Sequence, residues 1–507
     1  MVAPIIEPPA LYRQAADHHH SFQNTDMQKA YHDFKDRYSA FFTTSEIDAL
    51  RAKEYKRLDE QNQVYLDYTG SSLYSDSQIH KHMTLLLHAI YGNPHSDNPT
   101  SSITSHQVAQ ARNAVLDYFK ASTDEYTVIF THNATGALKL LGESYPFTSD
   151  SKFLLFVDNH NSVNGIREFA RSKGAHIQYI PVKKSNLRLD PSMLDEYLNN
   201  ARTGIANLFA YPAQSNFSGV QHPLEFIARA QEKGWDVLLD AAAFVSTNEL
   251  DLSQWHPDYV DISFYKIFGY PTGVGCLILK HKAMAKLKRP WFAGGTVEVV
   301  SVQGDGYYFH EGYSAYEDGT ANFLSLAGVP IGLRHVQMIG VKKIHERVMI
   351  LTDWLIKQLL ALRHTNGTPL IRLYGPSNVR MRGGILTMNF LGPDGLVIDP
   401  GIIEHYAAQE NISIRTGCFC NPGCIETIND IAKLDVEKLL HCGHPISFEE
   451  YVAALPGKTM GAVRVSLGIV SNFADVYQFV QFARSFIDKE IAERLQYCTK
   501  QMCNSSC

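Results

Sequence analysis

The chain of 507 residues has no long apolar run, no excess of basic residues and no leader-like N-terminus. Its longest apolar stretches, such as Val274–Leu279, fall far below the roughly 18–20 residues that a membrane-spanning helix requires. The first residues lack the basic region and the continuous apolar core of a signal peptide. A formal net charge of −6 does not indicate binding to nucleic acid or to an anionic membrane. We therefore expect a cytoplasmic protein that binds neither nucleic acid nor membrane.

Glycine, proline and cysteine are too scarce to define a fibrous, low-complexity or disulfide-rich protein. The chain has 34 glycines, 21 prolines and eight cysteines, which excludes a collagen-like chain and a small disulfide framework. Hydrophobic residues make up 45% and charged residues 19%, as in ordinary globular chains, so disorder over most of the length is excluded. The length favours two or three packed units or one large α/β fold whose partner is a small molecule or another protein.

Between residues 127 and 280, short apolar runs alternate with helical stretches. Such runs are typical of strands that are buried on both faces of a mostly parallel sheet in an α/β domain. The seven runs predict a large domain at residues 91–330. Strands are predicted at Thr127–Thr131, Phe153–Asp158, His176–Val182, Ile205–Tyr211, Val237–Asp240, Ile262–Tyr265 and Val274–Lys280, and helices at Ala134–Ser144, Gly165–Lys173, Pro191–Ala201 and Pro223–Gly234.

The segments on either side of this alternation predict a second, smaller α+β domain. It combines residues 31–90, with a short extended piece at Val64–Leu66, and residues 331–494. Residues 1–30 are expected to form a flexible arm and residues 495–507 a flexible tail. The later part of the small domain is predicted to contain a long helical stretch at Leu324–Arg363, strands at Gly384–Phe390 and Val463–Leu467, and helices at Ile402–Glu410 and Phe473–Arg494.

Two charged residues end apolar runs of the predicted sheet. Lys266 lies in SFYKIFGYPTGVG, and Asp240 ends VLLD and is followed by Ala241–Ala243, which are too small to occlude a ligand. Ligands of open α/β sheets bind outside the carboxyl ends of the strands. A lysine and a carboxylate placed there suit pyridoxal 5′-phosphate (PLP), because the amine can form a Schiff base and the carboxylate can keep the pyridine nitrogen protonated.

A third segment offers a phosphate site. Phe130–Gly136 runs from a strand into a helix whose first turn contains Ala134 and Thr135. Exposed backbone N–H groups and the helix dipole favour a phosphate there, and hydroxyl groups near Lys266, on Ser263 and Tyr265, add donors. An ordinary asparagine cap explains the same pattern when it is taken alone.

These segments together resemble a known family. They are similar to the class V, fold type I PLP-dependent enzymes that include cysteine desulfurases, and specifically to the N-terminal desulfurase domain of molybdenum cofactor sulfurases. The resemblance implies a large PLP-binding domain and a smaller α+β domain. The matching segments span roughly residues 60–490 and include VYLDYTGSSLYS (64–75), YGNPHSDN (91–98), VIFTHNATGALKL (128–140), YPAQSNFSGVQHPL (211–224), LLDAAAFVST (238–247), SFYKIFGYPTGVG (263–275), FAGGTVEVV (292–300), YEDGTANFLSL (316–326), IRTGCFCNPGC (414–424) and VRVSLGIVSNFADV (463–476).

The resemblance assigns roles at the cofactor. Lys266 would be the Schiff-base lysine and Asp240 the partner of the pyridine nitrogen. His160 would stack over the ring and Asn216 would lie near its phenolic oxygen. Thr320 would reach the phosphate of a neighbouring subunit, which implies a homodimer with shared sites. Thr135, Ser263 and Tyr265 would hold the phosphate, and Ala134 would also bind the cofactor.

The resemblance also implies how a substrate is held. Arg464 would bind the carboxylate of the substrate and Arg415 would assist, because a guanidinium fork suits bidentate recognition of a carboxylate. Taken alone, Arg464 is more often part of a structural ion pair.

Three cysteines lie in the Gly/Pro-containing loop RTGCFCNPGC, which we call the cysteine loop (residues 415–424). They can carry a persulfide, be inert thiols, or form a metal site completed by Cys442 or His444. Their spacing matches zinc sites poorly, so we expect no metal. The resemblance places the nucleophile at Cys420, with Cys418 and Cys424 as alternatives. Arg415 can lower the pKa of the reactive thiol.

The function that this predicts is a PLP-dependent L-cysteine desulfurase. Lys266 would move the Cα proton and Cys420 would attack the substrate sulfur, which leaves a protein persulfide and alanine. By the resemblance the sulfur goes to the molybdenum cofactor. Because the chain ends about a dozen residues after its last predicted helix, the C-terminal cofactor-binding domain of the resembled sulfurases is expected to be absent, and the acceptor can be another protein or small molecule instead.

Two other hypotheses remain open at this point. A PLP-dependent C–S lyase or aminotransferase in a specialised biosynthetic pathway needs no persulfide, so replacing Cys420 by alanine would leave its turnover intact. A non-catalytic sulfur-relay or scaffold protein with a degenerate site would not bind PLP at all.

Overall fold

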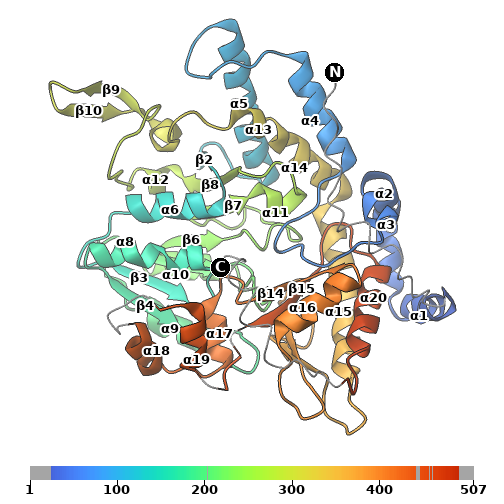
Figure 1. Ribbon diagram of the computed structural model, residues 1–507. Helices are drawn as coiled ribbons and strands as arrows, with labels where there is room; N and C mark the ends of the chain where they lie inside the picture. The colour runs from blue at the N-terminus through green and yellow to red at the C-terminus, as the bar shows by residue number, and fades with distance from the viewer. Residues whose placement is uncertain (1–23, 203, 441–445, 456, 460, 490–507) are drawn as a thin grey trace.

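The computed structural model describes residues 24–202, 204–440, 446–455, 457–459 and 461–489. Its largest sheet has seven strands in the order β2-β8-β7-β6-β5-β3-β4 (Figure 1). β8 is antiparallel to both neighbours and the other pairs are parallel. The predicted α/β class with a mostly parallel seven-stranded sheet is thus confirmed. The strands are β2 (Tyr126–Thr131), β3 (Lys152–Phe156), β4 (His176–Ile180), β5 (Leu208–Pro212), β6 (Asp236–Asp240), β7 (Tyr259–Ser263) and β8 (Gly275–Lys280).

Side chains of these strands pack alternately into two apolar layers, one on each face of the sheet. Val237 and Leu239 of β6 belong to one cluster of buried residues and Leu238 belongs to the other, as the two-residue repeat of a strand requires. One layer is completed by α6 (Ala134–Ser144), α7 (Asn161–Asn164), α8 (Ile166–Ser172) and α12 (His281–Met284), and the other by α5 (Pro99–Tyr118), α9 (Pro191–Leu198), α10 (Phe226–Glu232) and α14 (Gly328–Ile339).

A smaller antiparallel sheet has the order β11-β12-β15-β14. It positions the cysteine loop, which continues directly from β14 into α17. α15 and α20 pack against each other, and α16 contacts three of the strands. The elements are β11 (Ile371–Tyr374), β12 (Ile385–Phe390), β14 (Arg415–Gly417), β15 (Ala462–Ser466), α15 (Val341–Ala361), α16 (Pro400–Gln409), α17 (Pro422–Ile428) and α20 (Phe473–Arg484).

The first described helices pack against α20, so blue and red segments lie side by side in Figure 1. α1 contacts α20, and a buried ion pair of 2.6 Å joins Arg51 of α2 to Asp475 of α20. β1 pairs in parallel with β13. The elements are α1 (Asn24–Arg37), η3 (Ser39–Thr44), α2 (Glu46–Glu54), α3 (Arg57–Glu60), β1 (Val64–Tyr65) and β13 (Ile412–Ser413).

Several expected boundaries are wrong. The flexible arm expected at residues 1–30 is helical from Asn24 onward in α1, and residues 1–23 and 495–507 lie outside the described residues. The helical stretch expected at Leu324–Arg363 consists of three helices, α13 (Phe323–Leu326), α14 and α15. Gly340 separates the last two with φ +90°, which glycine adopts without strain. The helix expected at Phe473–Arg494 ends at Arg484.

The strand expected at Ile262–Tyr265 also ends early. β7 stops at Ser263, and the chain turns at once into the short helix α11 (Phe264–Phe268). Lys266 is therefore in a helix that follows the strand and is not the last residue of the strand itself. The chain still delivers it to the carboxyl edge of the sheet.

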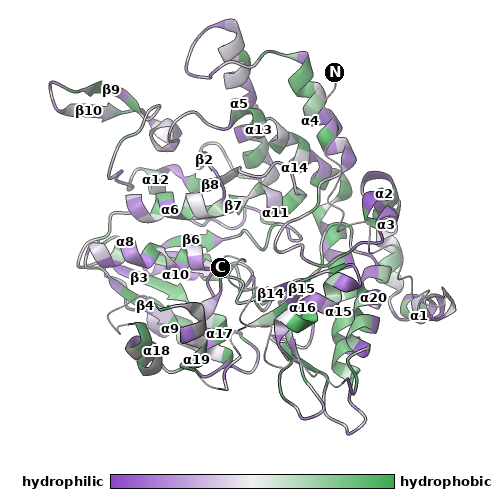
Figure 2. Ribbon diagram, in the orientation of Figure 1, coloured by the Kyte–Doolittle hydropathy of each residue, from purple (hydrophilic) through white to green (hydrophobic). Residues whose placement is uncertain are grey.

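A two-stranded hairpin, β9 (Val297–Ser301) and β10 (Gly306–Phe309), projects away from the body of the molecule (Figure 1). It carries apolar residues on its surface, which are green in Figure 2, and Val302 and Tyr308 are mostly exposed. The sequence analysis did not predict this hairpin. The remaining elements are α4 (Asp76–His88), η4 (Gly312–Tyr316), α18 (Lys433–Leu440) and α19 (Phe448–Ala453).

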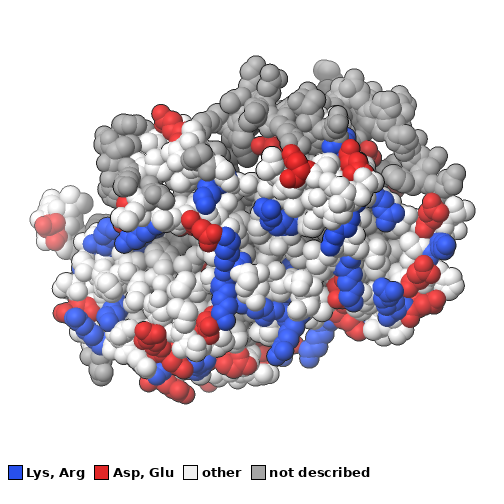
Figure 3. Space-filling model, turned by 90° about the horizontal axis from the view of Figure 1, so that it is seen from below, with Lys and Arg blue, Asp and Glu red and all other residues white. Residues whose placement is uncertain are grey.

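The described surface mixes charges of both signs. On the face in Figure 3, Lys and Arg side chains lie among Asp and Glu side chains. Within the described residues, no single helix has the length and apolar composition needed to cross a bilayer. The pair Phe323–Ile339 and Val341–Ala361 reaches these limits only when taken together, and it bends by 64°. Many of the apolar residues of these helices, such as Leu333 and Leu351, are buried in the core.

Candidate active site

A cavity of about 120 Å³ lies at the carboxyl ends of β5, β6 and β7, beside the start of α6. We call it the Lys266 pocket. Open α/β sheets bind ligands at this edge. The pocket brings together eight of the residues that the sequence analysis proposed, which are Ala134, Thr135, His160, Asn216, Asp240, Ser263, Tyr265 and Lys266.

Asp240 and Lys266 form the electrostatic centre of the pocket. Asp240 is the last residue of β6 and is buried, and its Oδ1 accepts a hydrogen bond of 3.0 Å from the N–H of Ala242. Burial raises the pKa of Asp240, and the positive charge of Lys266 opposes this shift. A buried carboxylate and the one lysine among the described lining residues therefore share the cavity.

His160 is held as a neutral imidazole. It caps α7, and its Nδ1 accepts a hydrogen bond of 3.1 Å from the N–H of Ser162. Burial, and then the positive charges of Lys266 and Arg464, lower the pKa of His160 to about 4. At pH 7 the ring is uncharged, and its proton is on Nε2 because Nδ1 accepts.

The N-terminus of α6 supplies a cradle of hydroxyl and N–H groups. The Ser263 hydroxyl accepts from the N–H of Ala134 at 2.9 Å, and the Thr135 hydroxyl lies 2.8 Å from that of Ser162. β8 approaches this turn closely, because a Cβ on Gly275 would lie 2.5 Å from the Cα of Asn133. The sequence analysis missed Ser162, which is brought here only by the fold.

The two arginines proposed for the substrate lie beside this pocket and share a carboxylate. Arg415 and Arg464 are opposite each other in β14 and β15. Asp67 accepts from Arg415 Nη2 at 2.7 Å and from Arg464 Nη2 at 3.1 Å. Burial lowers the pKa of Arg464, and Asp67 opposes this shift. Arg464 also donates to the backbone oxygen of Asn216 at 3.1 Å, which ties it to the pocket wall.

Asp67 was not among the predicted site residues, and its sequence signal is weak. Asp67 follows the apolar piece Val64–Leu66 in VYLDYTG, just as Asp240 ends VLLD. The first strand has only two residues, Val64–Tyr65, so the signal was weak. In this structure Asp67 is the group that neutralises the arginines. Arg464 Nε has no hydrogen-bond partner within the described part of the chain.

Hydrogen bonds dock the cysteine loop onto the rim of the Lys266 pocket. Asn216 Nδ2 donates to the backbone oxygen of Phe419 at 2.7 Å, and the N–H of Asn161 donates to the backbone oxygen of Cys420 at 2.7 Å. Asn421 Nδ2 donates to Asn216 Oδ1 at 2.9 Å. Phe419 and Cys420 both have a positive φ, +55° and +53°, a conformation that residues other than glycine rarely adopt. The side chain of Asn216 thus faces the loop.

The three thiols of the loop have different surroundings. Cys424 is fully buried, and burial together with the charge of Asp158 raises the pKa of its thiol well above its ordinary value. Cys418 and Cys420 are partly exposed. Cys420 is close enough to Arg464 to act on its pKa electrostatically, in the raising direction, so the two groups are neighbours. The thiolate is the reactive form, which disfavours Cys424 as the nucleophile.

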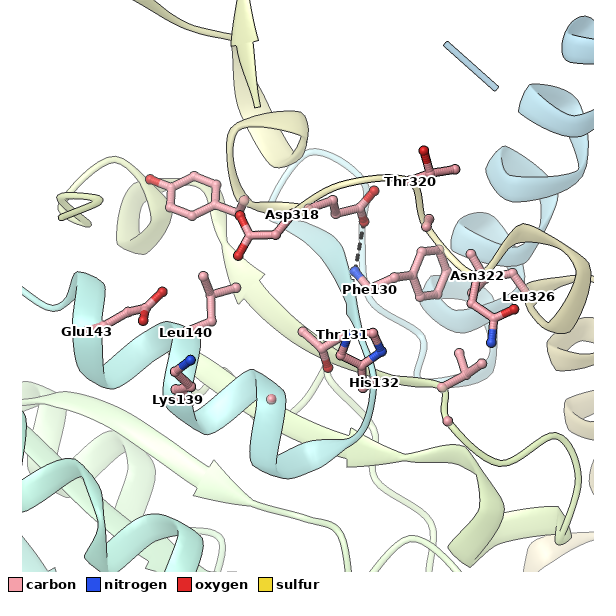
Figure 4. Close-up of a pocket in the computed structure, with 16 residues that line it drawn as sticks. Phe130, Thr131, His132, Lys139, Leu140, Glu143, Asp318, Thr320, Asn322 and Leu326 are labelled. Carbon is pink, nitrogen blue, oxygen red and sulfur yellow. Dashed lines mark hydrogen bonds between the residues drawn. The ribbon is translucent and has the colours of Figure 1, made fainter. Parts of the chain in front are cut away.

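Thr320 lies outside the Lys266 pocket. It lines a neighbouring cavity of about 250 Å³, together with Thr131, His132 and Lys139 (Figure 4). Its hydroxyl accepts a hydrogen bond of 3.2 Å from Asn93 Nδ2. One chain alone does not bring Thr320 to the other proposed cofactor residues, and its predicted contact with a neighbouring subunit stays a prediction.

Within the described residues, no group of three His, Cys, Asp or Glu side chains is placed to hold a metal ion. Cys442 and His444, the residues considered as completing a metal site, lie outside the described residues.

A lysine and a buried carboxylate that meet at the carboxyl edge of a mostly parallel seven-stranded sheet, next to a helix N-terminus, define the architecture of the fold type I PLP-dependent enzymes. The family model described as aminotransferase class-V matches residues 64–479. The chain belongs to the class-V aminotransferase family.

Curated relatives and solved structures are similar to this chain. The molybdenum cofactor sulfurase of Solanum lycopersicum is 38% identical over 87% of the chain, and that of Homo sapiens 35% over 85%. The chain spans 57% and 50% of the length of these two relatives. A cysteine desulfurase from Thermococcus onnurineus has a TM-score of 0.72 at 22% identity, and one from Escherichia coli 0.68 at 18%; each match covers 87% of this chain and 98% of the solved one.

Proposed function

We propose that the protein is a PLP-dependent L-cysteine desulfurase, which moves the sulfur of L-cysteine onto Cys420 and then to an acceptor. One observation carries this proposal. The pocket that contains Lys266 and Asp240 is hydrogen-bonded through Asn216 to a loop with partly exposed cysteines. A lyase or aminotransferase needs the pocket alone, whereas a desulfurase needs the pocket and the thiol together.

The residues of the pocket fit PLP, the cofactor that family membership indicates. Lys266 is the amine that would hold it covalently, and Asp240 is the buried acid that would face the pyridine nitrogen. The start of α6 offers N–H groups and the hydroxyl of Thr135 to a phosphate, and the end of β7 offers the hydroxyl of Ser263. When bound, PLP supplies an electron sink for the charge that develops at the substrate Cα.

The side chains around this site divide the remaining work. Lys266 is the amine placed to take and return the Cα proton, because it is the one Lys or Arg among the described residues that line the pocket. His160, which is neutral at pH 7, packs beside it without adding charge. Asp67 keeps both arginines in position before a substrate binds, and Arg464 would then hold the substrate carboxylate.

Sulfur transfer assigns the remaining step to Cys420. Its thiolate attacks the substrate sulfur and the bond between this sulfur and the Cβ of cysteine breaks. A proton is then delivered to that Cβ. L-cysteine and a protein thiol thereby become alanine and a protein persulfide, with no external oxidant. The names of the curated relatives support the molybdenum cofactor as the final acceptor.

We also propose that two copies of the chain form the working enzyme. The hairpin β9–β10 exposes Val300, Val302 and Tyr308 without a covering element, and such apolar surface is typical of an interface. The cavity that holds Thr320 lies beside the start of α6 and shares the 131–136 turn with the Lys266 pocket. A partner that covers this side would bring its own residues close to the cofactor.

The test is to incubate the PLP-reconstituted protein with L-cysteine and to measure alanine and protein persulfide. The wild type should form both, Lys266→Ala neither, and Cys420→Ala no persulfide, whereas Cys418→Ala serves as the matched thiol control. Turnover of cysteine that depends on Lys266 but not on Cys420 would overturn the desulfurase in favour of a lyase or aminotransferase. Alanine formation that is unaffected by Lys266→Ala would overturn both.

A further inference from the structure

A second buried carboxyl group lies next to Asp240. Asp261 in β7 is paired in register with Asp240 in the parallel strand β6, so the two side chains are neighbours on the same face of the sheet. Asp261 is fully buried and Asp240 is 8% exposed. Both line the Lys266 pocket. The sequence analysis gave no role to Asp261, which interrupts an otherwise apolar strand.

The oxygens of Asp261 lack ordinary partners. Neither Oδ1 nor Oδ2 accepts a well-formed hydrogen bond from a protein N–H or O–H group within the described residues. The carboxyl group does lie within hydrogen-bonding reach of the Asp240 carboxyl group. Two carboxylates cannot hydrogen-bond to each other, because both are acceptors, so contact between them requires one proton.

The charges around the pair favour a single proton on Asp261. Burial, and then the negative charge of Asp240, raise the pKa of Asp261 well above its ordinary value. Lys266 opposes both shifts, and Asp158 adds negative charge near Asp240. Cys276 is paired with Ile262 and lies on the opposite face of the sheet from Asp261, and burial and then the charge of Asp261 raise the pKa of its thiol, so it stays neutral. Like-charged acids that share a buried site ionise one at a time.

We propose that Asp261 is a positioning residue that carries a proton and donates a hydrogen bond to the Asp240 carboxylate. This bond, together with the N–H of Ala242, gives Asp240 two donors in a site that water does not reach freely. Asp240 can then remain ionised toward the pyridine nitrogen although it is buried. The inference rests on the cofactor site of the proposed function but not on the reaction with cysteine.

The first test uses the apo-protein, so it needs neither PLP nor cysteine. Infrared spectroscopy at neutral pH should show the C=O stretching band of a buried protonated carboxylic acid, and Asp261→Asn should remove it. Asp236→Asn is the matched control, because Asp236 is a buried acid of β6 that is paired with Lys286 and should leave the band unchanged. A wild-type spectrum without the band, or a band that survives in Asp261→Asn, would overturn the proposal.

The second test measures the affinity for PLP by spectroscopic titration. Asparagine at position 261 keeps an N–H donor toward Asp240, whereas valine keeps only the approximate size. Asp261→Asn should bind PLP nearly as tightly as the wild type, and Asp261→Val about ten- to one hundred-fold more weakly, the worth of a hydrogen bond to a charged group. Equal affinity of Asp261→Val and wild type would refute the positioning role, whatever the desulfurase assay shows.

Discussion

The Lys266 pocket and the cysteine loop are joined by hydrogen bonds, yet they hold their chemical groups in different ways. Asp240 and Asp261 are fixed by the ladder of the large sheet, and Lys266 by a helix that starts at a strand end. Cys420 is held through its backbone oxygen by the N–H of Asn161, and the adjacent Phe419 by the side-chain amide of Asn216, in a segment with positive φ. The residues that would hold the cofactor are therefore fixed by regular secondary structure, whereas the thiol lies on a loop that a few hydrogen bonds attach to the pocket.

The largest effect is expected when the Lys266 pocket loses its lysine. Lys266→Ala removes the amine that would hold the cofactor and move the Cα proton, so alanine formation from cysteine should fall by about 10³-fold or more. Lys139→Ala is the matched control, because Lys139 lines the neighbouring cavity and should leave the rate within about twofold. Steady-state assays of alanine on both reconstituted variants make the comparison. A Lys266→Ala enzyme with wild-type turnover would contradict the account.

The next effect separates the thiols of the loop. Cys420→Ala should abolish the protein persulfide but bind PLP as the wild type does, because the pocket is untouched. Cys424→Ala should keep persulfide formation and lose about 1 kcal/mol of unfolding free energy, since it removes a buried sulfur from packed surroundings. Mass spectrometry locates the persulfide, and denaturant unfolding gives the stability. Persulfide found on Cys424 would show that the loop rearranges.

A smaller effect tests the carboxylate that Arg415 and Arg464 share. Asp67→Ala leaves the buried Arg464 without its carboxylate and should cost about 3 kcal/mol in the free energy of unfolding. Arg415 pairs with the same Asp67 but is half exposed, so Arg415→Ala should cost less than about 1 kcal/mol. Urea denaturation of both variants measures the difference. Similar costs for the two variants would mean that burial of Arg464 is not what makes Asp67 important.

The last effect is absent at neutral pH and appears only when the pH is lowered. The pKa of His160 is about 4 in the folded protein and about 6.5 in the unfolded chain, so between these values the unfolded chain binds a proton that the folded one does not. Wild-type stability should therefore fall relative to His160→Gln as the pH drops from 7 to 4, by roughly 3 kcal/mol at most. Melting temperatures of both proteins across this range test the sign. A stability difference between the two proteins that does not change with pH would place His160 in a solvated environment.

Much of the large sheet could be predicted because its strands are buried on both faces. Continuous apolar runs such as Phe153–Phe156 leave little choice but a central strand. The hairpin β9–β10 was missed because its side chains are mostly exposed and its apolar residues face solvent. The break at Gly340 was also missed, because the helical pattern of the sequence continues through this residue although its positive φ ends one helix and starts the next.

The site residues, too, could be predicted only where the local sequence pattern was clear. Asp240 and Lys266 were visible because a charge at the end of an apolar run is conspicuous. Asp67 follows a strand of two residues, and Asp261 lies inside an apolar strand, so neither pattern suggested a ligand site. The pairing of Asp261 with Asp240 depends on which strands are neighbours, and that is a property of the topology that a local sequence pattern does not contain.

The most direct test of the central claim is to reduce the PLP-reconstituted protein with borohydride and to map the modified lysine by peptide mass spectrometry. The account predicts a single phosphopyridoxyl group on Lys266, with labelling lost in Lys266→Ala. Labelling of a different lysine, or none after reconstitution, would contradict it.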